Sequence, residues 1–174
     1  MEETHKFRVV AWWSSERNGI AKSDSAPNAI QFTAPAAFGG MEGRWTPEDL
    51  LLGSVASCYT TTFQAVAAYS QFDYNDLGVE VEGTVKKINS GYAFQKIVIR
   101  PTLTIADEGA RQHAADILRK VESLCLVSRA LSTTQVFDPK VEVAEPGRSS
   151  ELFTSGKKNQ TRDGKLVLQG EGVQ

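Results

Sequence analysis

The sequence predicts an α+β fold in which mostly antiparallel sheets pack around two helices. Segments rich in β-branched and aromatic residues are separated by turn signals, as expected of strands, and two helical segments interrupt them. The resulting order is three strands, a helix, two strands, a helix and a last strand, which is typical of α+β proteins. A chain of 174 residues is long enough for one domain with a sizeable core.

The N-terminal segments predict a small sheet. Residues 7–13 (FRVVAWW) have the composition of a first strand, and Asn18-Gly19 is a strong hairpin signal. Residues 20–23 and 29–33 predict two further short strands. The glycine-rich residues 34–44 match neither a Walker P-loop nor a dinucleotide-binding motif, so they predict a flexible loop and not a phosphate site.

The central feature is a long helix predicted over residues 46–72. Thr46 can cap its N-terminus, Pro47 suits the first helical position, and acidic residues follow in the first turn. No charge occurs over residues 50–72, which predicts a helix buried on nearly every side. This stretch is long enough to span a bilayer, but its many Ser, Thr and Gln residues favour packing against protein.

The second half of the chain adds strands and one more helix. Residues 79–88 alternate between apolar and polar types, which predicts a strand with one wet face. Residues 92–105 predict its antiparallel partner, in which Pro101 indicates an edge position or a bulge. Residues 107–124 carry a helical apolar stripe, and residues 136–143 predict the last strand.

The composition changes after residue 146, so we expect one domain over residues 1–146 and an extension over residues 147–174. The extension has many glycines and few apolar residues, and it is predicted to be weakly structured or to add one strand at residues 165–169. One apolar helix and two small sheets are too little to cover each other within a single chain. We therefore expect a homodimer to complete the burial.

Composition and charge exclude several functions. A net charge of -2 gives no electrostatic reason to expect binding of nucleic acid. The sequence also has no run of basic residues of the kind that anchors a protein to a membrane surface. The two histidines match no metal-binding spacing, so neither a metal nor a bound cofactor is expected. The acidic N-terminus does not resemble a secretory signal, and two cysteines without such a signal favour a reducing compartment, the cytoplasm.

Chemistry is left to the two thiols, Cys58 and Cys125. The ordinary interpretation of each is a small buried hydrophobe. A thiolate is favoured by a cation or a helix N-terminus and disfavoured by apolar burial. Cys58 lies in mid-helix, so as a nucleophile it would need an arginine. Cys125 follows the C-terminal, partially negative end of a helix, which makes it the better resolving thiol.

Two segments resemble the cysteine motifs of the OsmC/Ohr family, the osmotically inducible and organic hydroperoxide resistance proteins. They are PEDLLLGSVASCYTTTF and LCLVSRAL, and the similarity extends over residues 7–143. The resemblance implies an intertwined homodimer that acts as a cytoplasmic, thiol-dependent peroxidase in the stress response and prefers organic hydroperoxides. It also implies that Cys58 is the peroxidatic cysteine, Cys125 the resolving cysteine and Glu48 the family's buried carboxylate.

The resemblance leaves the family's catalytic arginine open between Arg17, which we favour, and Arg44. Leu126 stands where the second motif usually has proline, so the Ohr and OsmC branches both stay open. The family relationship further implies an external dithiol reductant, of lipoyl type. Two other functions remain: a non-enzymatic dimer that binds an apolar ligand, and another thiol enzyme on the same fold.

Helix geometry adds a hypothesis about the site. Glu48 and Cys58 are separated by about 15 Å along a straight helix and by about 80° around it. One arginine cannot easily reach both, so we expect Glu48 and the arginine of one chain to meet Cys58 of the other. Trp45, Tyr59 and Phe63 are candidates to line an apolar substrate pocket, with core packing as the alternative.

Overall fold

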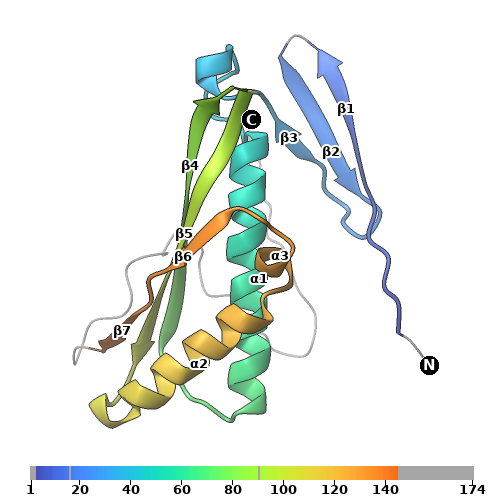
Figure 1. The fold of residues 1–174 in the computed structure, drawn as a ribbon. Helices are drawn as coiled ribbons and strands as arrows, with labels where there is room; N and C mark the ends of the chain where they lie inside the picture. Colours follow the sequence, from blue (N-terminus) through green and yellow to red (C-terminus); the bar gives the residue numbers. More distant parts are fainter. Residues whose placement is uncertain (1–2, 16, 90, 145–174) are drawn as a thin grey trace, which may run out of the picture. The chain divides into compact units, whose positions relative to one another are not determined.

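The computed structural model describes residues 3–15, 17–89 and 91–144, and within them it confirms the α+β class (Figure 1). The first sheet is antiparallel in the order β1-β2-β3, with β1 at Val9–Ser15, β2 at Asn18–Ser23 and β3 at Ile30–Phe32. A β1–β2 hairpin is present as predicted, but Asn18 and Gly19 begin β2, where they pair with Ser15 and Trp13, and do not form the turn itself. The predicted extension, residues 147–174, lies outside the described residues.

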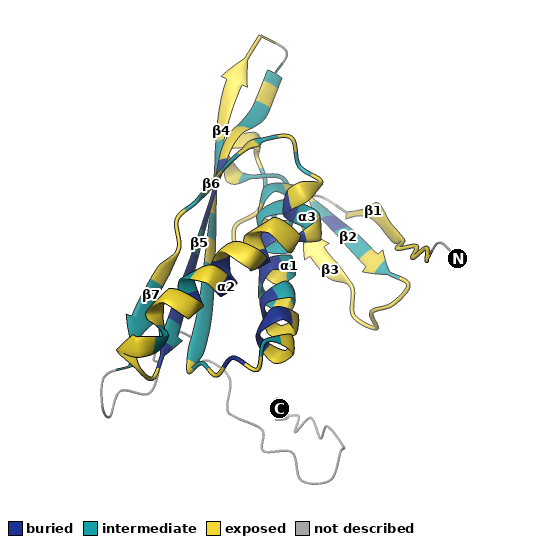
Figure 2. Cartoon of the chain, turned by 60° about the horizontal axis from the view of Figure 1, so that its bottom comes forward, coloured by how far each residue is buried: buried dark blue, intermediate teal, exposed yellow. Residues whose placement is uncertain are grey.

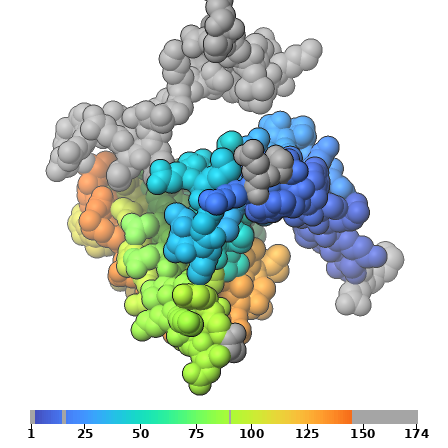
Figure 3. All heavy atoms as spheres, turned by 90° about the horizontal axis from the view of Figure 1, so that it is seen from above, coloured from blue at the N-terminus to red at the C-terminus, as the bar shows by residue number. Residues whose placement is uncertain are grey.

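The segment before the central helix is an ordered loop with a short 3-10 turn, η1, at Ala36–Phe38. The ring of Phe38 packs edge-on against Tyr92, with the ring centroids 5.0 Å apart. Figure 3 shows this light-blue segment beside the green strands that follow the helix. The two ends of the loop are joined by a hydrogen bond from the Thr33 backbone N–H to the Trp45 carbonyl at 2.9 Å.

The central helix α1 spans Pro47–Tyr69, and its start agrees with the sequence prediction. Thr46 and Asp49 form a capping box, in which the Asp49 N–H donates to Thr46 Oγ1 at 3.1 Å and the Thr46 N–H donates to Asp49 Oδ2 at 2.9 Å. Two backbone N–H donors at the helix start, those of Thr46 and Asp49, are thereby satisfied reciprocally. In length and composition α1 also meets the requirements of a membrane span, as the core helix of a globular domain can.

The second sheet contains β4 (Asp76–Ile88), β5 (Gly91–Ile105), β6 (Thr134–Phe137) and β7 (Lys140–Val143). β4 and β5 are antiparallel as predicted, whereas β6 and β7 both run parallel to β5. The single last strand predicted over residues 136–143 is therefore wrong. Two strands share that edge of β5, and the chain leaves the sheet between them at Asp138-Pro139.

Pro101 was expected at an edge or a bulge, and that prediction is wrong as well. It lies fully buried on β5, which has neighbours on both sides. The reason is a gap along the second edge of β5, because pairing with β6 ends at Ile99 and pairing with β7 begins at Thr102. A residue without an N–H is tolerated where no ladder hydrogen bond is required of it.

Two further helices complete the described chain. Asp107 caps a 3-10 turn, η2 (Glu108–Ala110), which leads into α2 at Arg111–Leu124. α3 follows at Leu126–Arg129, with Cys125 as the junction between the two helices. α1 packs against both α2 and β4. The buried core comes mainly from α1, α2 and β5, and partly buried residues of β4 pack against it.

The helix α1 is buried along one face only, which corrects the expectation of burial on nearly every side. Its buried residues follow one helical stripe: Val55, Tyr59, Phe63, Val66 and Ala67. Figure 2 shows exposed positions on α1 alongside the buried ones. Since the exposed positions after the first turn carry no charge, a single chain leaves an uncharged surface along the rest of this helix.

Candidate active site

The structure brings the two cysteines together. Cys58 lies in the middle of α1 and is partly exposed, whereas Cys125 is fully buried at the α2–α3 junction. The backbone N–H of Val127 donates a hydrogen bond to Cys58 Sγ at 3.5 Å. Cys58 packs against the buried cluster that contains Cys125, and each thiol affects the pKa of the other, so the two side chains are neighbours.

These contacts determine the pKa of Cys58. Burial raises the pKa of its thiol, but hydrogen bonds from the Val127 backbone, the Cys125 thiol and the Thr62 hydroxyl outweigh this effect. The net result is a pKa below that of an ordinary thiol. Because donors stabilise a thiolate as a cation does, Cys58 does not depend on an arginine alone for activation, contrary to the expectation from its mid-helix position.

The pKa of Cys125 is shifted in the opposite direction. Burial raises the pKa of this thiol, and the hydrogen bond to Cys58 together with the negative charge of Cys58 raises it further. The sequence argument gave the same direction from the end of a helix, but the main physical cause is burial. Of the two thiols, Cys58 is thus the one that loses its proton first, and Cys125 is the one that keeps it.

Glu48 occupies the first turn of α1 but does not join the two cysteines. Its Oε2 atom is buried and has no hydrogen-bond partner among the described residues. The capping box of α1 uses Asp49, so Glu48 is not needed to cap the helix. A buried carboxylate oxygen without a donor is costly, which makes Glu48 a candidate for a contact outside this chain's described part.

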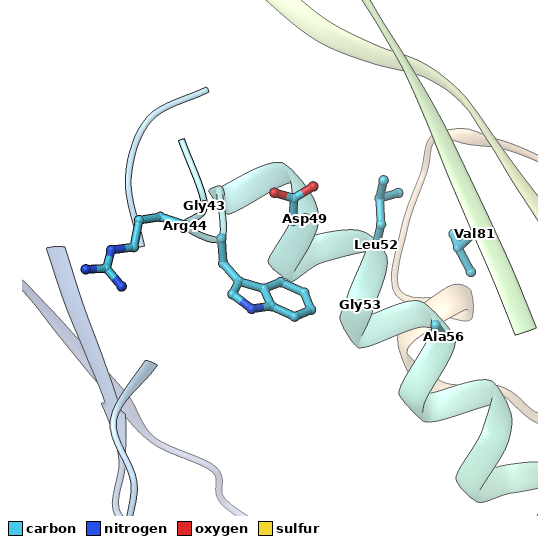
Figure 4. Close-up of a pocket in the computed structure, with 8 residues that line it drawn as sticks. Gly43, Arg44, Asp49, Leu52, Gly53, Ala56 and Val81 are labelled. Atoms are coloured by element: carbon cyan, nitrogen blue, oxygen red, sulfur yellow. The ribbon is translucent and has the colours of Figure 1, made fainter. Parts of the chain in front are cut away.

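Neither candidate arginine reaches Cys58 within the described part of the chain. Arg17 lies exposed in the turn between β1 and β2, where its carbonyl accepts a hydrogen bond from Thr33 Oγ1 at 2.7 Å. Arg44 lies exposed in the loop before α1, and its guanidinium points away from that helix (Figure 4). The structure of one chain therefore leaves the choice between them open.

A cavity of about 480 Å³ lies beside the N-terminal half of α1 (Figure 4). Its lining includes Arg44 and Trp45 from the loop, Asp49 and Leu52 from the helix, and Val81 from β4. Trp45 is thus a lining residue, as the sequence analysis expected. Its indole lies over Gly53, where a Cβ atom would approach a ring carbon to 3.3 Å.

Tyr59 and Phe63 do not line this cavity, which corrects their expected place in the pocket. Both side chains are fully buried in the core. The Tyr59 hydroxyl donates to the Leu118 carbonyl at 2.9 Å, and Phe63 packs edge-on against Tyr74 with centroids 4.9 Å apart. These residues lie on the face of α1 that packs against the rest of the chain, so core packing was the right interpretation.

Sequence reasoning missed two groups that contact Cys58. Thr62 follows Cys58 by one helical turn on the same face of α1, so the i, i+4 spacing could have identified it. Val127 could not have been identified from its residue type, because it acts through its backbone N–H. Only the fold brings that group to the thiol.

With this geometry in view, comparison with known proteins identifies the class. The family model described as OsmC-like protein matches residues 39–140, more than half of the chain, and the chain belongs to this family. A curated relative, the uncharacterized protein YmaD of Bacillus subtilis (strain 168), is 28% identical over 130 residues, which cover 73% of this chain and 87% of YmaD.

Solved structures show the same OsmC-like fold. An OsmC-like protein of unknown function from Vibrio cholerae superposes with a TM-score of 0.68 and 16% identity, covering 78% of this chain and 99% of that one. The organic hydroperoxide resistance protein OsmC from Legionella pneumophila gives a TM-score of 0.65 and 18% identity, with 82% and 100% covered. OhrB of Bacillus subtilis gives 0.56 and 22%, with 80% and 98% covered. At these identities the likeness concerns the fold alone.

Proposed function

We propose that this protein is a thiol-dependent peroxidase that reduces organic hydroperoxides to alcohols. The observation that carries the proposal is the contact between two thiols whose pKa values are shifted apart, Cys58 downward and Cys125 upward. A nucleophilic thiolate beside a neutral thiol is the arrangement that peroxide reduction followed by disulfide formation requires. Membership of the OsmC-like family, with solved relatives called hydroperoxide resistance proteins, supports the same chemistry.

The first step is attack of the Cys58 thiolate on the terminal oxygen of the hydroperoxide. A sulfur–oxygen bond forms, the oxygen–oxygen bond breaks, and an alkoxide leaves and takes up a proton as the alcohol. Cys58 becomes a sulfenic acid. The Val127 N–H and the Thr62 hydroxyl, which contact the thiolate sulfur, hold it in position for this attack.

The second step joins the two cysteines. The Cys125 sulfur attacks the sulfenic sulfur of Cys58, and the hydroxyl leaves as water once it has taken up the Cys125 proton. An external dithiol then reduces the Cys58–Cys125 disulfide by thiol–disulfide exchange and is itself oxidised to a disulfide. We propose a lipoyl-type dithiol in the cytoplasm as this reductant, and no bound metal or cofactor takes part.

The complete site is proposed to form in a homodimer. The exposed face of α1, which is uncharged after the first turn, and the unpartnered Oε2 atom of Glu48 both support a second chain at this surface. Glu48 and an arginine, Arg17 or Arg44, of one chain would then meet Cys58 of the other. The guanidinium would orient the peroxide and add to the stabilisation of the thiolate.

The proposed activity is tested by replacing Cys58 with serine and measuring the consumption of cumene hydroperoxide with a dithiol reductant. We expect Cys58→Ser to abolish consumption, because serine is no nucleophile at neutral pH. Cys125→Ser should still consume about one equivalent of peroxide and accumulate the sulfenic acid. Unchanged consumption by Cys58→Ser would overturn the proposal in favour of an apolar-ligand-binding dimer or another activity.

The preference for organic hydroperoxides is tested in the same assay. Hydrogen peroxide, cumene hydroperoxide and a fatty-acid hydroperoxide are compared by kcat/KM. The apolar parts of the cavity lining, Trp45, Leu52 and Val81, favour the two organic substrates if the cavity holds the alkyl group. Equal kcat/KM values for all three peroxides would contradict that preference.

A further inference from the structure

The Val127 N–H that contacts Cys58 belongs to a very short helix, so something must hold that helix in place. α3 has only the four residues Leu126–Arg129, and a helix of this length is not stable by itself. Its first N–H groups have no partner within the helix, which leaves the Val127 N–H free to donate to Cys58 Sγ. The direction of this bond depends on the contacts that fix α3 to the rest of the fold.

Side-chain hydrogen bonds that fix α3 come from Gln135 on the strand β6. Its side-chain Nε2 donates to the Ser128 carbonyl at 2.8 Å and to the Leu131 carbonyl at 3.4 Å. The Ser128 hydroxyl in turn donates to Gln135 Oε1. One side-chain amide thus binds α3 through a backbone carbonyl and through the hydroxyl of the same residue.

The chemistry of these groups fixes the orientation of the Gln135 amide. The carbonyl groups of Ser128 and Leu131 can only accept, so they must face the NH₂ group. The oxygen of the amide is then left for the Ser128 hydroxyl, which is nearly fully buried at 6% exposure and needs a partner. Neither a carboxylate nor an apolar side chain of the same size can make all of these bonds.

Gln135 is itself held by the centre of the second sheet. It pairs with Ile97 of β5, which is fully buried, and Phe137 on the same strand packs beside Tyr59 with ring centroids 6.0 Å apart. A continuous series of contacts therefore leads from β5 through β6 to α3 and ends at the sulfur of Cys58.

From this geometry we infer that Gln135 is a positioning residue, whose side-chain amide holds α3 so that the Val127 N–H stays directed at Cys58 Sγ. The inference rests on the proposed function of Cys58 as the nucleophile. Gln135 lies outside both cysteine motifs. In this inference it helps to activate the Cys58 thiol without contacting the peroxide. Ser128 assists by accepting and donating on the α3 side.

The test compares Gln135→Glu and Gln135→Leu with the wild-type protein. The rate of iodoacetamide alkylation at Cys58 is measured against pH and read from the Cys58 peptide by mass spectrometry. Both variants remove the donors to the Ser128 and Leu131 carbonyls, so α3 loses its fixed place. We expect about tenfold slower alkylation at a pH below the pKa, the effect of a pKa raised by about one unit.

The matched control is Val141→Ala on β7, which pairs with Leu103 of the same strand β5, beyond the stretch of β5 that pairs with β6. This variant loses apolar packing and should unfold at lower urea, yet its Cys58 alkylation profile should match the wild type. Ser128→Ala, which keeps the carbonyl and loses only the hydroxyl, should give an intermediate profile and serves if the Gln135 variants do not fold.

An unchanged alkylation profile in Gln135→Glu or Gln135→Leu would overturn the inference and leave the proposed function standing. In Ser128→Ala, used in their place, an unchanged profile would overturn it equally. Alkylation needs no peroxide, so the two ideas fail separately. A reactive Cys58 without any peroxide consumption would overturn the proposed function, while the alkylation profiles would still decide the role of Gln135.

Discussion

Cys58 and Cys125 show how individual contacts divide two identical side chains into different chemical species. Both thiols are affected by burial, which disfavours the thiolate. The opposite directions of the two pKa shifts come from the hydrogen bonds. Several donors act on Cys58 and lower its pKa, whereas Cys125 acts as a donor to Cys58 and its own pKa is raised. The proposed roles of nucleophile and resolving thiol follow from this asymmetry.

The asymmetry predicts two separate pH dependences of alkylation. Because the pKa of Cys58 is lowered, its alkylation should remain fast below the ordinary thiol pKa and decline only as the pH falls through the lowered value. The alkylation of Cys125 should rise only above the ordinary thiol pKa. Mass spectrometry of the two cysteine peptides across a pH series measures both.

The unfolded protein provides the control for this measurement. In urea, both cysteines should titrate near the pKa of an ordinary thiol, since the hydrogen bonds and the burial are lost. Coincident profiles for Cys58 and Cys125 in the folded protein would contradict the assigned pKa shifts.

At the scale of single residues, the sequence pointed to the two thiols that the fold brings together, but it missed the Thr62 hydroxyl and could not identify backbone groups. The cysteine motifs identified Cys58 and Cys125, and Glu48 followed from its place in the first motif. The donor at Val127 was beyond prediction, because every residue type except proline has the same N–H. The reverse error concerned Tyr59 and Phe63, whose aromatic rings suit a pocket and a core equally well.

At the scale of elements, local signals were reliable wherever the cause is local. The start of α1 followed from Thr46 and Pro47, and the existence of the β1–β2 hairpin was predicted, although Asn18-Gly19 begins β2 and does not form the turn. The division of residues 136–143 into two strands could not be predicted, since it depends on how β5 is shared between them. The same sharing explains Pro101, whose place in a central strand contradicts the usual rule.

The capping box of α1 leads to a prediction about stability. Thr46→Ala removes the acceptor for the Asp49 N–H and should lower the free energy of unfolding by about 1 kcal/mol. Urea denaturation at a fixed protein concentration measures the change. Thr46→Ser keeps the hydroxyl and should stay near the wild type, and an alanine variant as stable as the serine variant would show that the cap contributes nothing.

At the scale of the whole molecule, a single chain covers only part of the surface of α1. The helix has no charged residue after its first turn, yet in this chain it buries only one stripe. Its exposed positions include the apolar residues Ala65, Ala68 and Tyr69, and contiguous exposed apolar surface favours association. The buried, unpartnered oxygen of Glu48 near the start of the same helix points to the same surface.

A site shared between two chains can be tested by mixing inactive variants. Glu48→Gln and Cys58→Ser should each lose peroxide consumption. If Glu48 serves the partner's Cys58, refolding the two variants together should restore activity, because each mixed dimer has one intact site. Activity that stays absent would mean that Glu48 acts within its own chain or not at all.

The matched control for that experiment mixes Cys58→Ser with Cys125→Ser. The structure places these two cysteines side by side in one chain, so a mixed dimer contains no complete pair. Turnover through a Cys58–Cys125 disulfide should therefore not return. Recovery in this control would mean that the resolving thiol can come from the partner.

The junction between α2 and α3 has a consequence for the oxidised protein. Cys58 and Cys125 are distant in the sequence, so the proposed disulfide would close a large loop and tie the α2–α3 junction to the middle of α1. A cross-link closing a loop of roughly 70 residues stabilises a folded chain by about 4 kcal/mol in the chain-entropy model. The same quantity opposes the reductant, because a disulfide that stabilises the fold is harder to reduce within it. In each round of the proposed cycle, the protein would thus alternate between a less stable reduced form and a more stable, disulfide-linked oxidised form.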